Sequence, residues 1–152
     1  MQQIVQLTDP RSVLSGTWQG ALPEVLAGRD ALVGQQARTA GAWGLDAAID
    51  LSDCEGDMLR DAGTLKAFAL ALCDQLGVRP CGGPMFHQQE QENTPDAWTL
   101  LQGTSTGHLA AQVLTQAQVI SLNVLSCLLF APYQVAAWCQ TWFGARQCQL
   151  TI

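Results

Sequence analysis

The sequence predicts an α+β fold, a two-layer sandwich in which helices cover one face of a mainly antiparallel sheet. Segments of alternating apolar and polar residues predict strands, and two segments with helical spacing predict helices. Their order along the chain is strand, helix, three strands, helix, strand, which is typical of this architecture. A chain of 152 residues is long enough for one domain with a substantial core. We expect this domain at residues 43–152, after an N-terminal extension at 1–42.

The extension is rich in Gly, Ala, Gln and Ser. Its leucines and valines predict one or two short helices, which glycines at four positions weaken. We expect the extension to pack on the domain or on a partner. The glycines are Gly16, Gly20, Gly28 and Gly34.

The first strand and the first helix of the domain have different periodicities. Ala47, Ile49 and Leu51 alternate with polar or small residues, which predicts a half-buried strand. Apolar residues then recur at helical spacing from 59 to 76. Gly77 follows them as a helix stop.

The rest of the chain predicts a loop, three strands, a helix and a last strand. Gly and Pro residues predict a loop over Pro80–Pro95, with room for one short strand at Met85–His87. Pro132 suits the first turn of a helix that Gly144 ends. Alternating patterns predict strands at 97–102, 107–114, 119–127 and 147–152.

Composition excludes several classes of protein. The net charge is −6 and there is no basic run, so neither a nucleic-acid surface nor a polybasic membrane patch is expected. No signal peptide or membrane-spanning segment is evident, so we expect a cytoplasmic protein whose six cysteines are reduced thiols. The cysteines include no C-x-x-C pair, so no metal site is expected. Only 13% of the residues are charged. These charged side chains are too few to make the sheet face opposite the helices widely polar. We therefore expect that face to be apolar and to be covered in a homo-oligomer.

Four segments in order resemble the pyruvoyl-dependent S-adenosylmethionine decarboxylases, especially bacterial relatives. Those enzymes have a Ser-x-x-Ser/Thr-Gly-His strand, then D-I-F-S-C, a helix and F-F-G-A. The resemblance covers roughly residues 43–150 and implies that family's fold and S-adenosylmethionine as the ligand. The matching segments are WGLDAAIDLSDC at 43–54, GTSTGHL at 103–109, NVLSC at 123–127 and WFGA at 142–145.

The resemblance implies roles for three residues. His108 matches the histidine that assists self-cleavage, and an imidazole exchanges protons near neutral pH. Cys127 matches the cysteine that donates a proton to the carbanion after decarboxylation, a step that suits a tuned thiol. Asp50 matches the acidic residue that contacts the substrate's amino group or the cleavage site, although Asp46 and Asp53 serve equally well. For His108 and Cys127 the alternative is a purely structural role.

Further residues near the GTSTGHL segment are candidates for substrate binding. They are Gly103, Thr104 and Thr106, with Trp98 as a ring that can stack on adenine.

The cleavage position departs from the family pattern. The family breaks its chain before a Ser, which becomes a pyruvoyl group that acts as an electron sink. Counting back from His108, that position falls on Gly103, which has no hydroxyl. Ser105 lies closer to His108 than the family spacing, so it would be the cleaved residue only after a deletion in this segment, which would shift the strand register. We therefore expect an uncut chain without a cofactor, and a pyruvoyl group only if the chain self-cleaves before Ser105.

Four functions follow from these observations. The favoured one is an enzyme that acts on the sulfonium of S-adenosylmethionine without a pyruvoyl group, by elimination, lactone formation or ring closure. The second is a pyruvoyl-dependent decarboxylase cleaved before Ser105. The third is a catalytically inactive paralogue that regulates an active partner, and the fourth is a small binding domain whose resemblance is accidental.

Overall fold

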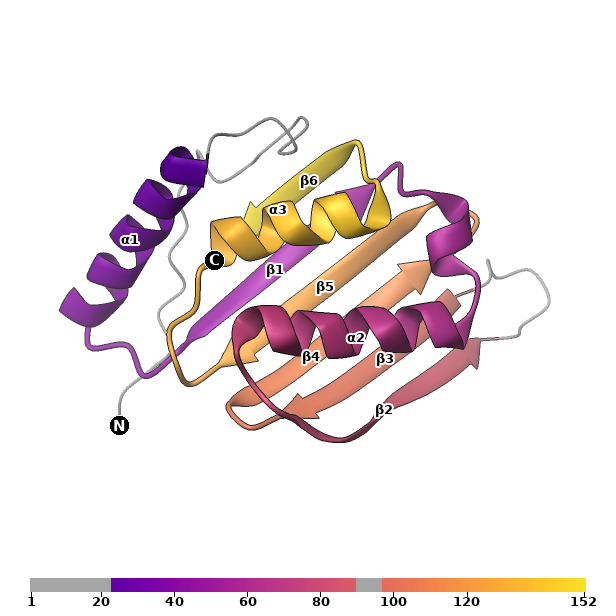
Figure 1. Cartoon of the computed structure of the whole chain (residues 1–152), viewed down its shortest axis with the longest axis horizontal. Coiled ribbons are helices and arrows are strands. Elements are labelled where there is room, and N and C mark those ends of the chain that lie inside the picture. Colours follow the sequence, from indigo (N-terminus) through magenta and orange to yellow (C-terminus); the bar gives the residue numbers. More distant parts are fainter. Residues whose placement is uncertain (1–22, 90–96) are drawn as a thin grey trace.

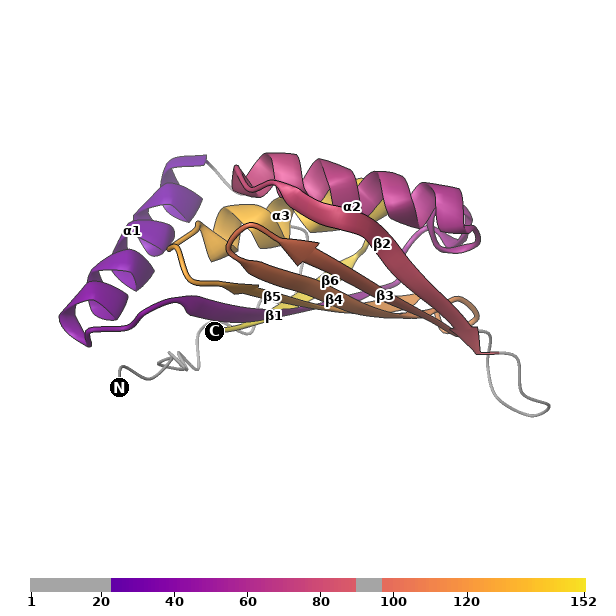
Figure 2. The same ribbon diagram turned by 90° about the horizontal axis from the view of Figure 1, so that it is seen from below.

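The computed structural model describes residues 23–89 and 97–152 and has two layers. A six-stranded antiparallel sheet in the order β2-β3-β4-β5-β1-β6 forms one layer, and helices α2 and α3 lie side by side on one of its faces (Figures 1 and 2). This confirms the predicted α+β sandwich. The strands are β1 (Leu45–Ser52), β2 (Pro80–Gln89), β3 (Ala97–Thr104), β4 (Gly107–Leu114), β5 (Val119–Ser126) and β6 (Gln147–Thr151). The helices are α1 (Pro23–Thr39), α2 (Ala62–Leu76) and α3 (Pro132–Phe143).

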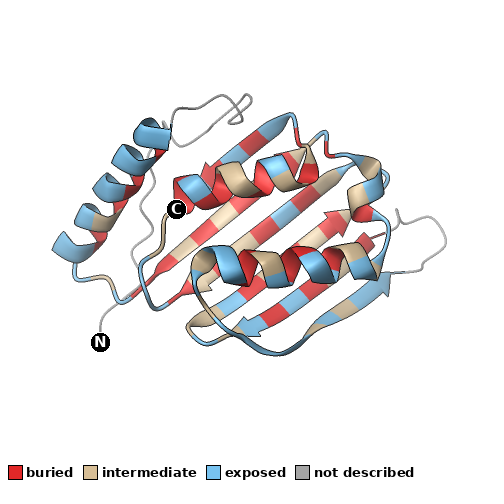
Figure 3. Cartoon of the chain, in the orientation of Figure 1, coloured by how far each residue is buried: buried red, intermediate tan, exposed pale blue. Residues whose placement is uncertain are grey.

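Strands β1, β4, β5 and β6 alternate between buried and more exposed residues, as the period of two requires (Figure 3). In β1 every second residue from Leu45 to Leu51 is fully buried. These residues meet the apolar faces of α2 and α3, where the rings of Phe68 and Phe143 pack at a tilt of 59° with centroids 4.5 Å apart. Such aromatic pairs add to the free energy of burial and fix the two helices against each other.

Both predicted helices of the domain are present, with one shifted start. Helix α2 begins at Ala62, because the Asp61 carboxylate accepts a hydrogen bond of 2.7 Å from the Thr64 amide and caps the helix. Residues 56–59 form a separate short 3-10 turn. Gly77 and Gly144 end α2 and α3 in the left-handed conformation, as predicted from their positions.

Two predictions need correction. Residues 80–89 form a full strand rather than a loop with a short strand, because β2 pairs with β3 across a bulge between Cys81 and Met85. In the extension, residues 23–39 form one helix of 17 residues that contains Gly28 and Gly34. Packing of α1 on α3 compensates for the low helix propensity of these glycines. The predictions for residues 1–22 and 90–95 lie outside the described residues.

No described helix covers the other side of the sheet, which we call the open face. Its β2–β3 half exposes Met85 (68%) and Leu101 (45%). Its β5–β1–β6 half carries polar side chains that bond across strands, so the expected apolar character does not extend over the whole face. The polar pairs are Ser121–Asp50, Asn123–Asp46 and Ser52–Gln147.

Candidate active site

His108 lies on the open face near one end of the sheet. It is exposed, whereas the next residue, Leu109, is buried beneath the helices. His108 pairs with Gly103 of β3 on one side and with Leu125 of β5 on the other. Directly paired residues share a face. His108 is therefore flanked by a glycine and a leucine on the open face.

Gly103 leaves a gap beside His108. A Cβ atom added to Gly103 would lie 3.6 Å from the carbonyl oxygen of Cys81 and 3.8 Å from its Cβ, which are ordinary contacts. A small side chain therefore fits at this position. Because Gly103 has none, the exposed Cys81 on β2 faces His108 across the gap. Cys81 was not among the predicted site residues, because it lies in a segment whose Gly and Pro residues predicted a loop.

Cys127 follows β5 at the same end of the sheet. Its amide donates a hydrogen bond of 2.8 Å to the Thr106 carbonyl and extends the β4–β5 pairing by one residue. Ser126 is buried on the helix side and Cys127 is exposed, as alternation requires. Cys127 is thus a diagonal neighbour of His108, and such neighbours are about 7 Å apart. The structure brings these two predicted residues together.

Asp50 lies far from His108. It pairs with Ser121, whose hydroxyl donates to the Asp50 carboxylate at 2.6 Å. Ser121 is four residues from Leu125, a translation of about 13 Å along β5. Asp46 instead pairs with Leu125 and lies in the cross-strand row of His108. Alternation in β1 places Asp46 and Asp50 on the same face, so only the strand register distinguishes them.

Asp46 is held in place by its neighbour on β5. The Asn123 side chain donates a hydrogen bond to the Asp46 carboxylate. The third candidate acid, Asp53, follows β1 in a left-handed turn with φ of 53° and is exposed. Among the three carboxylates considered from sequence, Asp46 is therefore the one that shares a row with His108.

Ser105 lies in the two-residue turn between β3 and β4. Its amide donates to the Arg79 carbonyl at 2.9 Å, and its hydroxyl accepts a hydrogen bond of 3.1 Å from the Arg79 amide. These two bonds hold Ser105 against the start of β2. Gly103, rather than Ser105, is the residue paired with His108. The residues present do not fit a pyruvoyl group derived from position 103, because glycine has no hydroxyl.

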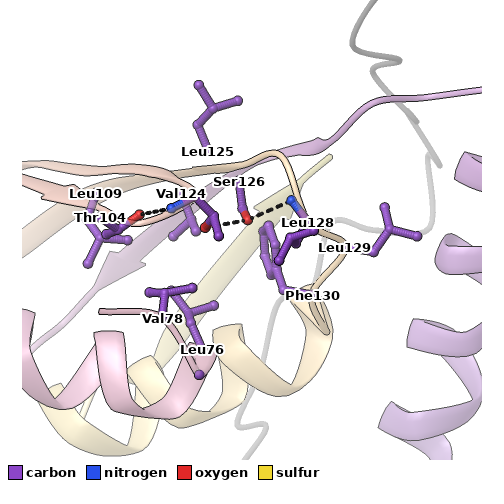
Figure 4. Close-up of a pocket in the computed structure, with 12 residues that line it drawn as sticks. Leu76, Val78, Thr104, Leu109, Val124, Leu125, Ser126, Leu128, Leu129 and Phe130 are labelled. Atoms are coloured by element: carbon purple, nitrogen blue, oxygen red, sulfur yellow. Dashed lines mark hydrogen bonds between the residues drawn. The ribbon is translucent and has the colours of Figure 1, made fainter. Parts of the chain in front are cut away.

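Thr104 and Thr106 line a pocket of about 100 Å³ on the helix side of the sheet (Figure 4). Thr104 Oγ1 accepts hydrogen bonds from the amides of Thr106 (3.3 Å) and Gly107 (3.0 Å), and these bonds close the turn. Ser126 Oγ donates to Thr106 Oγ1 at 2.9 Å. The sheet therefore separates these two threonines from the His108 side chain.

Trp98 also lies on the helix side. It pairs with Val113, which is fully buried there, and its ring meets Phe86 edge-on with centroids 6.4 Å apart. Trp98 is five residues from Gly103 along β3. The structure does not bring the indole to the His108 end of the open face.

Two glycines allow close backbone approach at this end of the sheet. A Cβ on Gly107 would overlap the Leu125 carbonyl, with 2.8 Å to its carbon. A Cβ on Gly44 would lie 3.0 Å from Cys127 Cα. The close pairing of β4 with β5 that sets His108 beside Leu125 therefore requires glycine at 107.

The described residues contain no group of three His, Cys, Asp or Glu side chains that could hold a metal ion. Four of the six thiols are buried and two, Cys81 and Cys127, are exposed. Burial raises the pKa of Cys54 to about 11 and that of Cys148 to about 12, and it raises the pKa of Cys73 and Cys139 as well. The thiols available for reaction in the folded chain are therefore at or beside the open-face site.

None of the described helices combines the length and apolar character needed to cross a membrane.

Comparison with known proteins identifies the family and the fold. The sequence profile of S-adenosylmethionine decarboxylase matches residues 46–152. The crystal structure of the adenosylmethionine decarboxylase from Aquifex aeolicus VF5 has the same fold, with a TM-score of 0.60 and 12% sequence identity over 71% of this chain and 86% of that one. None of the curated proteins matches this sequence. Since the profile spans well over half of the chain, the protein belongs to the S-adenosylmethionine decarboxylase family.

Proposed function

We propose that this protein binds S-adenosylmethionine and breaks a carbon–sulfur bond of its sulfonium without a pyruvoyl group. The observation that carries the proposal is the pairing of His108 with Gly103, where the family needs a hydroxyl. Family membership supports the ligand, and the glycine argues against decarboxylation through a ketone made at this position.

The residues of the open face suit sulfonium chemistry. A sulfonium is already activated, because its thioether leaves as a neutral molecule. His108 takes a proton from the carbon next to the one bound to sulfur, the carbon–sulfur bond breaks, and its electron pair stays on sulfur. The products are methylthioadenosine and an unsaturated amino acid, and His108 passes the proton to water.

Lactone formation is the related route. The substrate's own carboxylate displaces the thioether, which again releases methylthioadenosine. Asp46 provides a carboxylate for the cationic substrate, and Cys127 lines the same end of the face. Both routes predict methylthioadenosine without carbon dioxide. The test is a product assay on S-adenosylmethionine, and absence of any sulfonium turnover contradicts the proposal.

The purified protein is expected to be a single uncut polypeptide. The hydroxyl of Ser105 is bonded to the Arg79 amide, and Gly103 has no nucleophile. The measurement is intact mass after long incubation. Two fragments produced by cleavage before Ser105, and absent from Ser105→Ala, would contradict this prediction and favour the pyruvoyl-dependent decarboxylase. A matched variant, Gly103→Ser, fits the gap and returns a hydroxyl beside His108.

We also propose that two copies pair through the β2–β3 half of the open face. Met85 and Leu101 are large apolar residues that are exposed side by side there. Sedimentation velocity at micromolar concentration is expected to give a dimer or a larger oligomer. Leu101→Glu places a charge in this contact and is expected to shift the protein to monomer, whereas Thr151→Glu, on the polar half, is not. A monomeric wild-type protein contradicts the proposal.

A further inference from the structure

Helix α1 lies outside the segment that matches the family, yet it packs on helix α3 (Figure 1). Leu26, Val33 and Ala37 are buried along one side of α1. On the same side lies Asp30, which is only 9% exposed. A buried carboxylate is costly unless it is bonded, so its partners indicate its role.

Asp30 caps helix α3 from another part of the chain. The residue at the N-cap of α3 is Ala131, which has no side chain to bond the first amides. The amides of Tyr133 and Gln134 donate to the two Asp30 carboxylate oxygens at 2.7 and 3.1 Å. This is the bonding that a Ser or Asp at the N-cap itself normally supplies, and the helix dipole favours a negative charge there. Burial raises the pKa of Asp30, and the two amide bonds oppose that rise.

Arg29 strengthens the same contact. Its guanidinium lies 5.6 Å from the centre of the Tyr133 ring, within the range of a cation–π interaction. Two consecutive residues of α1 therefore bind the first turn of α3.

The first turn of α3 fixes one end of the segment 127–131, which we call the site loop. Two hydrogen bonds hold the other end. The Cys127 amide donates to the Thr106 carbonyl, and the Leu128 amide donates to Ser126 Oγ at 3.1 Å. Between these anchors, Leu128, Leu129 and Phe130 line the pocket (Figure 4). Cys127 is exposed, and alternation from the buried Ser126 places it on the open face. The placement of Cys127 therefore depends on how firmly both ends of a short loop are held.

We propose that Asp30 is a positioning residue for the candidate active site, and that α1 serves to hold the site loop through it. This rests on the proposed function only in that Cys127 belongs to the site. The positioning itself can be tested by thiol chemistry without any turnover.

The test compares iodoacetamide alkylation of Cys127 with that of Cys81 in the same sample by peptide mass spectrometry. Cys81 lies on β2, away from the site loop, and serves as the internal reference, while the four buried thiols react slowly because burial raises their pKa. Loss of a helix cap changes local equilibria about five- to thirtyfold. In Asp30→Ala we expect the ratio of the Cys127 rate to the Cys81 rate to change by that factor.

Two further variants separate positioning from general destabilisation. Asp30→Asn keeps an acceptor oxygen and is expected to return the ratio close to the wild-type value. Val113→Ala removes buried volume from the sheet core and is expected to leave the ratio unchanged. An unchanged ratio in Asp30→Ala, or an equal change in Val113→Ala, overturns the proposal.

If Asp30→Ala does not fold, wild-type hydrogen exchange decides the matter. The amides of Tyr133, Gln134 and Leu128 are then expected to open as one unit. Independent opening of the helix start and the loop overturns the proposal. If the wild-type protein does not turn over S-adenosylmethionine, the proposed function fails, whereas the thiol ratio and the exchange data still decide the role of Asp30.

Discussion

Gly107→Ala is expected to destabilise the protein by about 3 kcal/mol, near the upper end of the usual cost of overpacking. The added Cβ meets the main chain of Leu125, which cannot rotate away as a side chain can. Strands β4 and β5 must separate at the end where His108 and Cys127 lie. Chemical denaturation measures the loss of stability, and the substrate assay is expected to show a parallel loss of activity.

The matched control for this prediction is Gly103→Ala. Its Cβ would meet Cys81 only at ordinary contact distances, 3.6 and 3.8 Å. We expect its free energy of unfolding to stay within about 0.5 kcal/mol of the wild type, as for most surface substitutions. If both variants lose the same stability, the close approach at Gly107 is not what limits the pairing of β4 with β5.

His108→Ala is expected to lower turnover of S-adenosylmethionine by about 100- to 10,000-fold, the usual contribution of a general acid or base. The imidazole is exposed on the open face and contributes little to the core, so the melting temperature is expected to change little. The measurements are steady-state kinetics and thermal unfolding on the same preparation.

The control for His108 is the other histidine of the chain. His87 is exposed on β2 and pairs with Thr99, four residues along β3 from Gly103. His87→Ala is expected to leave turnover unchanged. If His108→Ala unfolds while its folded fraction keeps full specific activity, His108 has a structural role and the proposed site is wrong.

Local patterns in the sequence were enough for most of the fold. Alternation in β1, β4 and β5 and helical spacing in α2 are consequences of side-chain direction, which depends on neighbouring residues alone. The boundaries of α3 follow from Pro132 and Gly144, each of which has a local conformational preference. The strand β2 was missed because its Gly and Pro residues lower local propensity, while pairing with β3 stabilises the strand.

The sequence by itself determined the layer architecture, the family resemblance and the chemical types at the site: an imidazole, a thiol and a glycine where a hydroxyl was expected. Only the tertiary structure decided which of these residues meet. Strand register placed Asp46 in the row of His108 and moved Asp50 about 13 Å along the sheet. Register also put Trp98 and the two threonines on the helix side, and packing of α1 on α3 made Asp30 the cap of a distant helix. Contacts between segments far apart in the chain set these arrangements, and no local pattern records them.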